Sequence, residues 1–402
     1  MNVFVIPAWY PSAAAPIAGS FIKEQTRCYA ELNPRDNVIV SVACMGAYPL
    51  AVRTPFKSLR TLATYLKGSG VSEIRCQNHC ELHASVLQWS PRLGGGNVNG
   101  FLHAHLANFR RAEETFGPID IIHAHVSYPA GWWALMIAQK MHRPYIITEH
   151  MGPFPFDNPL LIRDGKLTER LSRPLASAGA IVAVGRSLAK AIFSYGFNKL
   201  CVIPNMVDET LFYPVTAEKD RHVRFNFLTV AALIPEKGIS ELLHAIKEVV
   251  AVCADCCFRI VGDGPSSGQF RTLASELGID AHLQWSGKVV RQDMPAIYQE
   301  ADAYVLPSRH ESFGISYVEA LACGKPVIAT RCGGPEDFVT ESNGIMVERG
   351  DIDGLARAML TMVKERGRYD SAVIRTDFMR QFSRPAVVEQ IRQLYLKTIA
   401  AS

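Results

Sequence analysis

The segment Arg309-His-Glu-Ser-Phe-Gly-Ile-Ser-Tyr-Val-Glu-Ala-Leu-Ala-Cys-Gly324 decides how the second half of the chain folds. It predicts a loop at the end of a strand that feeds a helix, with Ser312 as the helix cap and Gly324, followed by Lys and Pro, as the stop. The first backbone N–H groups of such a helix have no intrahelical partner, and they attract phosphate. Here these groups are expected around Phe313, Gly314 and Ile315.

Two carboxylates, Glu311 and Glu319, stand eight positions apart in this segment. Helical side chains lean toward the N-terminus, so the Glu319 carboxylate is expected to point back over the helix start, with Glu311 on its other side. Ionised carboxylates accept hydrogen bonds from sugar and ribose hydroxyls. The pair therefore predicts a nucleotide-sugar site. Taken alone, Glu311 also fits a helix-dipole partner worth about 0.3 to 1 kcal/mol, and Glu319 a solvated helix residue.

Apolar strands alternate with helical patterns along all 402 residues, which predicts an α/β protein with two parallel sheets, each wrapped by helices. Strands are expected at 3–6, 38–42, 119–123, 145–148, 180–184 and 201–203, then near 227 and at 258–261, 282–285, 303–306, 327–330 and 344–347. The polar stretch 214–222 lacks periodicity and predicts the boundary between domains 1–214 and 215–384. Parallel sheets bind ligands beyond the carboxyl ends of their strands.

Composition is that of an ordinary globular protein, with 20% charged and 48% hydrophobic residues. The net charge of +4 suits an anionic substrate or membrane face and is too small to indicate a nucleic-acid partner. Met1–Pro7 reads as a buried strand, and no apolar run reaches the roughly 18 to 20 residues of a spanning helix. We expect a cytoplasmic protein.

Ten cysteines raise the question of a metal site. Cys253 and Cys256 form a C-x-x-C core without a second ligand pair at zinc-finger spacing, and Cys76 and Cys80 with His79 form a weaker grouping. The remaining cysteines are scattered through apolar segments. We expect reduced packing residues and no metal.

The segment around the two glutamates resembles the retaining glycosyltransferases of the GT-B fold, specifically glycosyltransferase family 4, whose signature is Glu, seven residues and Glu. The resemblance covers nearly the whole chain. Further similar motifs are Pro204-Asn-Met-Val-Asp208 with Phe212, Leu233-Ile-Pro-Glu-Lys-Gly238, Val261-Gly-Asp-Gly-Pro265, Ala301-Asp-Ala-Tyr-Val-Leu-Pro-Ser308, Gly324-Lys-Pro-Val-Ile-Ala-Thr330 and Gly333-Gly-Pro-Glu336. It implies two doubly wound Rossmann-like domains that face each other across a cleft. The N-terminal domain would bind the acceptor and the C-terminal domain the nucleotide sugar, with a final helix at about 385–399 packing back on the first.

The resemblance also implies an activity: metal-independent transfer, with retention, of a sugar from a UDP- or GDP-sugar to a glycan or lipid-linked acceptor (EC 2.4, hexosyltransferase type). Lys237 would stabilise the leaving diphosphate, Glu311 would hold sugar hydroxyls, and His125 would approach the donor sugar from the first domain. The residues implied in donor binding are Gly19, Gly262, Phe313, Gly314, Ile315 and Glu319. No cofactor is expected.

His125 closes the strand Asp120-Ile-Ile-His-Ala-His125 and shares a face with His123. Either histidine also fits a hydrogen-bonded core residue. Glu149 and His150, at the end of the next strand, are secondary candidates for the same site.

One position departs from the family: Ala231 and Ala232 stand where the family usually carries Gly-Arg, with the Arg as a second phosphate cation. Arg309, Lys325 and Arg331 are the candidate replacements. The departure keeps open a non-catalytic nucleotide- or partner-binding subunit of a glycan-assembly complex. A GT-B sugar-nucleotide epimerase or a phosphorylase would use the same cleft.

Residues 52–67 alternate basic and apolar side chains, which predicts a basic amphipathic helix. The basic members are Arg53, Lys57, Arg60 and Lys67, and the apolar ones are Phe56, Leu59, Leu62 and Leu66. Such a helix either lies on an anionic membrane or packs in the ordinary way. Peripheral contact with the inner membrane and an acceptor from bacterial cell-surface polysaccharide or lipopolysaccharide synthesis are the corresponding expectations.

Overall fold

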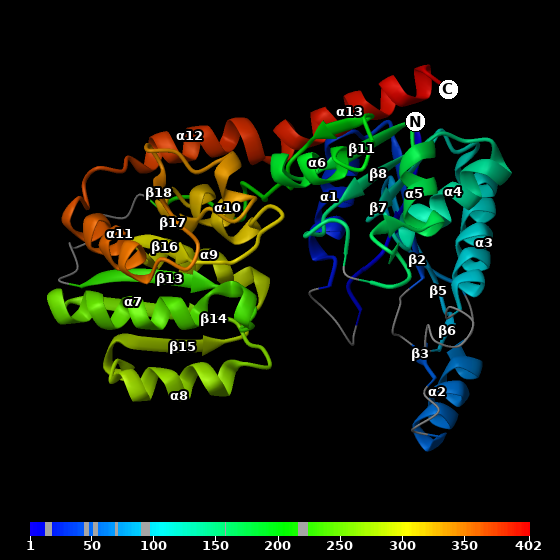
Figure 1. The fold of residues 1–402 in the computed structure, drawn as a ribbon. Helices are drawn as coiled ribbons and strands as arrows, with labels where there is room; N and C mark the ends of the chain where they lie inside the picture. Colours follow the sequence, from blue (N-terminus) through cyan, green and yellow to red (C-terminus); the bar gives the residue numbers. More distant parts are fainter. Residues whose placement is uncertain are drawn as a thin grey trace. The chain divides into compact units, whose positions relative to one another are not determined.

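A computed structural model divides the chain into two units, each built around its own sheet (Figure 1). It describes residues 1–12, 18–43, 48–50, 55–68, 71–89, 97–156, 158–215 and 224–402. The first domain comprises Met1–Val184, Ala189–Ile203 and Val388–Ser402, and the second comprises Gly185–Leu188 and Pro204–Val387.

The first domain contains an eight-stranded sheet in the order β12-β11-β8-β7-β1-β2-β5-β4. All its strands run parallel except β4, which is antiparallel to β5. The strands are β1 (Asn2–Pro7), β2 (Asn37–Ala43), β4 (Val71–Cys76), β5 (His79–Ala84), β7 (Ile121–His125), β8 (Tyr145–Glu149), β11 (Ala180–Ala183) and β12 (Leu200–Val202). Short strands pair as β3 (Tyr48–Pro49) with β6 (Leu87–Gln88), and β9 (Ile162–Arg163) with β10 (Lys166–Leu167).

The helices of the N-terminal half are α1 (Ser20–Leu32), α2 (Pro55–Gly68), α3 (Val98–Phe116), α4 (Ala130–Met141), α5 (Glu169–Ser177) and α6 (Arg186–Phe193). Strands β1, β7 and β8 are almost fully buried, because their apolar residues face helices on both sides of the sheet. Among the described residues, no helix combines the length and apolarity that crossing a membrane requires.

The hairpin of β4 and β5 is missing from the expected strands. The sequence did not predict it because Glu81, a charged residue, lies in the middle of β5, where it is only 1% exposed. Tyr10 donates a hydrogen bond to its carboxylate at 2.9 Å, and Lys23 and His83 lie 3.1 Å from it. Burial alone would raise the pKa of Glu81, but these hydrogen bonds lower it to about 2. Because this buried charge interrupts the apolar residues of β5, the segment does not show the apolar pattern that predicts a strand.

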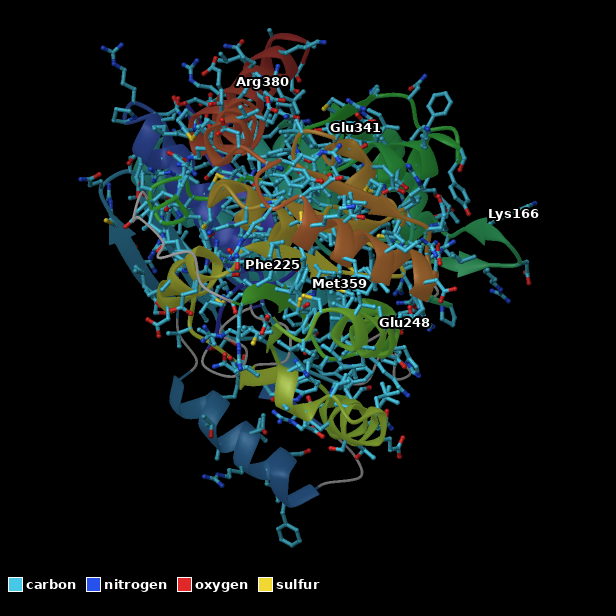
Figure 2. The ribbon with its side chains drawn as sticks, turned by 90° about the vertical axis from the view of Figure 1, so that its left-hand side faces the viewer. Lys166, Phe225, Glu248, Glu341, Met359 and Arg380 are labelled. Atoms are coloured by element: carbon cyan, nitrogen blue, oxygen red, sulfur yellow. The ribbon has the colours of Figure 1, made fainter. Side chains whose placement is uncertain are left out.

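The second domain contains a six-stranded parallel sheet in the order β15-β14-β13-β16-β17-β18. Its strands are β13 (Phe225–Val230), β14 (Cys256–Val261), β15 (Leu283–Gly287), β16 (Ala303–Leu306), β17 (Val327–Thr330) and β18 (Gly344–Val347). Its helices are α7 (Ile239–Val252), α8 (Ser267–Leu277), α9 (Met294–Glu300), α10 (Ile315–Ala322), α11 (Ile352–Lys364) and α12 (Ser371–Phe382), with 3-10 turns at Pro235–Lys237 (η1), Asp280–His282 (η2), Arg291–Asp293 (η3) and Pro335–Asp337 (η4). In Figure 2, Phe225 of β13 and Met359 of α11 mark buried positions, whereas Glu248 of α7 is exposed.

Both sheets have the doubly wound order in which the chain starts in the middle and proceeds to each edge in turn. The two doubly wound Rossmann-like domains that the sequence predicted are therefore confirmed. Every expected strand has a counterpart, with β7 shifted by two residues.

The domain boundary lies earlier than the expected 214/215, at Ile203/Pro204. Residues 204–214 join the second domain because α12 holds them: the Val207 N–H donates to the Phe382 carbonyl at 3.0 Å, and Arg375 donates to the carbonyls of Glu209 and Phe212. Most of the stretch 214–222 lies outside the described residues. Helix α13 (Arg384–Ala400) begins in the second domain and continues into the first, where Tyr395 bonds His123 at 2.6 Å.

Candidate active site

Lys237 and Glu311 form an ion pair at the carboxyl edge of the second sheet. Lys237 ends the η1 turn after β13, Glu311 follows β16, and the Lys237 Nζ lies 2.7 Å from the Glu311 Oε1. The Ser308 hydroxyl donates to the same oxygen at 2.8 Å. The two loops are joined through the Arg309 N–H, which donates to the Glu236 carbonyl at 2.8 Å. The structure thus brings together two residues that are 74 positions apart in sequence.

Glycines allow the strand-end loops to approach this closely. Gly238 has φ +67°, and a Cβ there would lie 1.9 Å from the Pro307 carbonyl oxygen. Gly262 has φ +134°, and a Cβ would lie 1.8 Å from the Ala231 oxygen. Any other residue at 238 would push the Lys237 turn away from the loop that carries Glu311.

Helix α10 starts beside Glu311, but its cap differs from the prediction. Gly314 is the N-cap, in the left-handed conformation with φ +98°, and no side chain caps the helix. Ser312 as the helix cap is therefore wrong, because the left-handed turn at Gly314 begins the helix at Ile315. The Phe313 side chain packs against Phe338 and Phe382, so only the backbone of 313–315 is left to meet an anion.

Glu319 is buried in the second turn of α10 and is held by two residues that the sequence did not single out. Its Oε1 pairs with the Arg291 guanidinium, and its Oε2 accepts from the Tyr298 hydroxyl at 2.8 Å. Arg291 in turn lies over the Phe212 ring, 5.0 Å from its centroid. The sequence offered one indication that Arg291 belongs to the site: it lies in a loop that follows an expected strand.

None of the three candidate replacements for the missing Arg pairs with Glu311 among the described contacts. Arg309 bonds Glu241, Arg331 lies 3.0 Å from Glu348, and Lys325 donates to the Gln299 carbonyl at 2.9 Å. A fourth cation, Arg349, acts on His310, the residue next to Glu311. Burial lowers the pKa of His310, Glu311 raises it, and Lys237 and Arg349 lower it further, so all three charges act on this one residue. Arg349 also donates to the Arg309 carbonyl at 3.1 Å.

Three histidines gather at the carboxyl edge of the first sheet. His125 closes β7 and is only 1% exposed; its Nδ1 lies 2.9 Å from the His150 Nε2, and the two rings stack. Burial, together with the neighbouring His123 and His150, keeps the pKa of His125 well below 6.5. The imidazole is therefore neutral at physiological pH. Because Nδ1 is occupied by His150, a substrate contact would fall to Nε2.

His123, whose two readings were open, is a hydrogen-bonded core residue. Its Nδ1 bonds Tyr395 at 2.6 Å and its Nε2 bonds Thr148 at 2.7 Å, while burial lowers its pKa to about 3. Glu149 is likewise fully buried. Its carboxylate accepts the backbone N–H groups of Ser127, His150 and Met151, each at 2.9 Å, and so ties the loop after β7 to the loop after β8. Both residues therefore have their polar groups bonded within the first domain, at the strand ends beside His125.

Gly19 caps helix α1 and lies near the same histidines. It has φ +68°, and a Cβ there would lie 2.3 Å from the Trp9 carbonyl oxygen, so close backbone packing already requires glycine. Two residues later, the Phe21 ring lies 4.8 Å from the His150 ring. The start of α1 and the ends of β7 and β8 thus converge. The preceding residues 13–17 lie outside the described ranges.

Both cysteine groupings stay close in the fold, since the Cys256 Sγ lies 3.4 Å from the Cys253 Sγ and Cys76 pairs with His79 across the β4–β5 hairpin. His79 is buried and bonds Thr26 at 3.1 Å, while Cys76 is exposed at the end of β4. Each described cysteine is a free thiol. Among the described residues, no three His, Cys, Asp or Glu side chains gather in a way that would hold a metal ion.

Comparison with known families matches two sequence models to consecutive parts of the chain. The family described as "Glycosyltransferase Family 4" matches residues 59–211, and the family described as "Glycosyl transferases group 1" matches residues 218–376.

Individual relatives agree with these families. An uncharacterized glycosyltransferase of Methanocaldococcus jannaschii is 28% identical over 69% of this chain and 75% of its own length. A GDP-mannose-dependent monoacylated alpha-(1-6)-phosphatidylinositol monomannoside mannosyltransferase of Corynebacterium glutamicum is 32% identical over 40% of this chain and 46% of its own. The crystal structure of Anabaena HepE in complex with UDP has a TM-score of 0.69 at 17% identity and covers 98% of this chain and 99% of its own.

Proposed function

The chain belongs to glycosyltransferase family 4, and from this premise we propose that it moves a sugar from a nucleoside-diphosphate donor to a lipid-linked or glycan acceptor with retention and without a metal ion. Its being a glycosyltransferase follows from the family. The observation that carries the proposed site is the ion pair of Lys237 and Glu311 at the carboxyl edge of the second sheet. UDP in the HepE structure and GDP-mannose in the name of the mannosyltransferase support a nucleotide-sugar donor of either base.

Lys237 and Glu311 would exchange partners when the donor binds. In the structure, each satisfies the charge of the other. A diphosphate offers Lys237 more negative charge than one carboxylate, and the sugar hydroxyls offer Glu311 hydrogen-bond donors in return. Lys237 and the start of α10 then stabilise the charge that develops on the leaving diphosphate, in place of a metal ion. Glu319, whose partners are Arg291 and Tyr298, would accept from the ribose.

His125 would contact the donor sugar as a neutral hydrogen-bonding group. Its pKa lies well below 6.5, so it is uncharged near neutral pH, where it is neither a strong proton donor to the leaving group nor a strong base. The departing diphosphate is the base that remains to take the acceptor proton. Glu311 is not assigned as a nucleophile, because retaining transfer by attack from the leaving-group face needs none; this differs from retaining glycosidases, which use paired carboxylates.

A lipid-linked acceptor and peripheral membrane contact are supported by α2. Phe56 and Leu59 are 87% and 63% exposed, and Arg60 beside them is exposed as well. A helix that presents aromatic and aliphatic side chains next to a basic one binds anionic membrane surfaces. Arg53 lies outside the described residues, as do the side chains of Lys57, Leu66 and Lys67. The lipid acceptor in the name of the mannosyltransferase agrees, and synthesis of a cell-surface polysaccharide or lipopolysaccharide is the corresponding pathway class.

The test is donor consumption and product analysis with UDP- and GDP-sugars, in the presence of a chelator. We expect one donor to be used, a product with the anomeric configuration of the donor, and no loss of rate on chelation. Glu311→Ala should abolish the reaction while the fold, checked by circular dichroism, persists. Undiminished turnover by Glu311→Ala would refute the assigned site.

The alternative is a non-catalytic nucleotide-binding subunit, favoured by Ala232 and by the engagement of Arg309, Lys325 and Arg331 elsewhere. It predicts nucleotide binding without transfer to any acceptor. An epimerase would instead interconvert the free donor without acceptor, and a phosphorylase would require inorganic phosphate.

A further inference from the structure

A cavity of about 280 Å³ lies in the first domain and has no part in the proposed chemistry. It sits beyond the carboxyl ends of three adjacent strands, because Trp9 follows β1, Tyr128 follows β7 and Met151 follows β8. This is the edge where open parallel sheets bind ligands. Met151 is also the neighbour of His150, which bonds His125.

The walls of this cavity are aromatic and uncharged. Trp133 and Phe101 stack with ring centroids 5.4 Å apart, and no Asp, Glu, Lys or Arg is among the described residues that line it. The two asparagines are engaged by the backbone. Asn97 donates to the Leu87 carbonyl and accepts from the Gly100 N–H, and Asn158 accepts from the Leu160 N–H. Gln88, Tyr128 and the indole rings add a few polar atoms, but apolar surface predominates in the lining and suits a hydrocarbon group.

Two short strands connect the wall of the cavity to the exposed apolar helix. Gln88 and Trp89 line it, and β6, which contains Gln88, pairs with β3. Strand β3 in turn contacts α2, the helix that presents Phe56 and Leu59 to solvent. Figure 1 shows α2, β3 and β6 following one another at one end of the first domain. The cavity wall, β6, β3 and α2 thus form a connected series of elements between the exposed apolar side chains and the strand ends near His125.

We propose that this cavity holds the part of the acceptor's hydrocarbon chain next to its headgroup, and so places the acceptor hydroxyl beside His125. The inference rests on the transferase function proposed above and names its acceptor class: an amphiphile with a hydrocarbon chain. The volume equals that of about nine water molecules at roughly 30 Å³ each, so a short segment enters and the rest of the chain remains outside.

The first experiment is calorimetric titration of the full chain, without donor, with farnesyl phosphate below its micelle concentration. Decyl phosphate distinguishes a branched prenyl chain from a straight one, and methyl glucoside serves as a sugar-only probe. We expect at least one phosphate amphiphile to bind and methyl glucoside neither to bind nor to compete. Binding of methyl glucoside in its place, or of no probe at all, would overturn the proposal.

Variants locate the binding within the molecule. Trp9→Ala and Phe156→Ala remove half-buried lining residues and should each weaken amphiphile binding about tenfold, because they remove apolar contact area. Trp132→Ala is the matched control, since Trp132 lies under Arg173 rather than in the cavity lining. If Trp9→Ala and Phe156→Ala bind the amphiphile as tightly as Trp132→Ala does, the assignment of the chain to this cavity is contradicted.

Two further measurements distinguish chain binding in the cavity from chain binding on α2, and failure of this inference from failure of the proposed function. The double variant Phe56→Ser with Leu59→Ser should lose binding to anionic vesicles and keep binding of soluble amphiphile; loss of the latter would place the chain on α2 and overturn the proposal. Stabilisation by UDP or GDP should be the same in Trp9→Ala as in wild type. If no nucleotide stabilises either protein, the proposed function fails, while amphiphile binding still reports on the cavity.

Discussion

In the second domain the carboxyl edge of the sheet carries ion pairs, Lys237 with Glu311 and Arg291 with Glu319. The same edge of the first domain carries neutral histidines, aromatic rings and one buried acid, Glu149, whose pKa is raised by burial. The two sheets share one winding order. Their difference therefore lies in the loops after the strands, not in the architecture.

This difference matches the chemistry assigned to each domain. A diphosphate requires fixed positive charge at the moment the glycosidic bond breaks. The ion pairs of the second domain hold such cations in place until the donor binds. An acceptor hydroxyl attached to a hydrocarbon chain carries no charge, and burying ions beside it would be costly. Under the proposed function, the edge of the second domain would meet the charged leaving group and the edge of the first domain the neutral nucleophile.

The largest expected effect is a selective loss of first-domain stability in acid. Burial lowers the pKa of His79 to about 4 and those of His105 and His123 to about 3, against 6.5 when unfolded. Below pH 6.5 the unfolded state binds more protons, so the stabilisation present above pH 6.5 is lost as pH falls toward 4. The loss approaches about 1.4 kcal/mol per pH unit for each histidine.

Hydrogen exchange at pH 7 and pH 5, corrected for intrinsic rates, follows both domains in one experiment. Peptides from β7 and β8 should lose protection before peptides from β16 and β17, because the described histidines of the second domain are all partly exposed. Equal loss of protection in both domains would contradict the claim that buried histidines make the first domain the more acid-sensitive one.

Next in size is Lys237→Ala, which removes the cation that faces the leaving diphosphate. We expect the turnover number to fall roughly 10²- to 10³-fold, the usual effect of deleting one preorganised electrostatic contact. Lys247→Ala, on the exposed face of α7, is the matched control and should leave turnover unchanged. If Lys237→Ala has the turnover number of wild type, the charged edge of the second domain takes no part in the chemical step.

His125→Ala should have a smaller effect, a fall of roughly 10- to 100-fold in kcat/KM, because it deletes a hydrogen bond without a charge change. The wild-type rate should show no inflection near pH 6.5 from this residue, since its pKa lies well below that value. The exposed His103 of α3 supplies the control, His103→Ala. An inflection near pH 6.5 that disappears in His125→Ala would show that His125 is charged in its working range.

Glu319→Gln should have the smallest effect, an increase of about tenfold in the KM of the donor at nearly constant turnover number. The substitution weakens binding that the ground state and transition state share. Steady-state kinetics with Glu248→Gln as the exposed control measure it. A fall in turnover number instead of a rise in KM would move Glu319 from donor binding into the chemical step.

Patterns that are local in sequence predicted local structure. Apolar runs gave the strands, and Gly324 marked the end of α10, whereas the helix begins after Gly314 and not at the predicted Ser312 cap. The resemblance to the family also selected Lys237 and Glu311, which the fold brings to 2.7 Å.

Contacts between distant segments were not predictable in the same way. The pair of Arg291 and Glu319 joins the loop after β15 to α10, and the buried charge of Glu81 depends on α1 and on the loop after β1. The aromatic cavity collects residues from loops far apart in the chain, each of which alone reads as ordinary core. Such features follow from tertiary packing, and no single segment carries their pattern.

The most direct test of the central claim, that the charged edge of the second domain binds the nucleotide part of the donor, is the thermal stability of wild type and Lys237→Ala with UDP and GDP in the absence of metal. At about 100 times its dissociation constant, a nucleotide should stabilise the wild-type protein by roughly 2.7 kcal/mol. One of the two nucleotides should raise the melting temperature of wild type and of Lys247→Ala, and raise that of Lys237→Ala much less. If neither nucleotide shifts wild type, or if Lys237→Ala responds as wild type does, the account is contradicted.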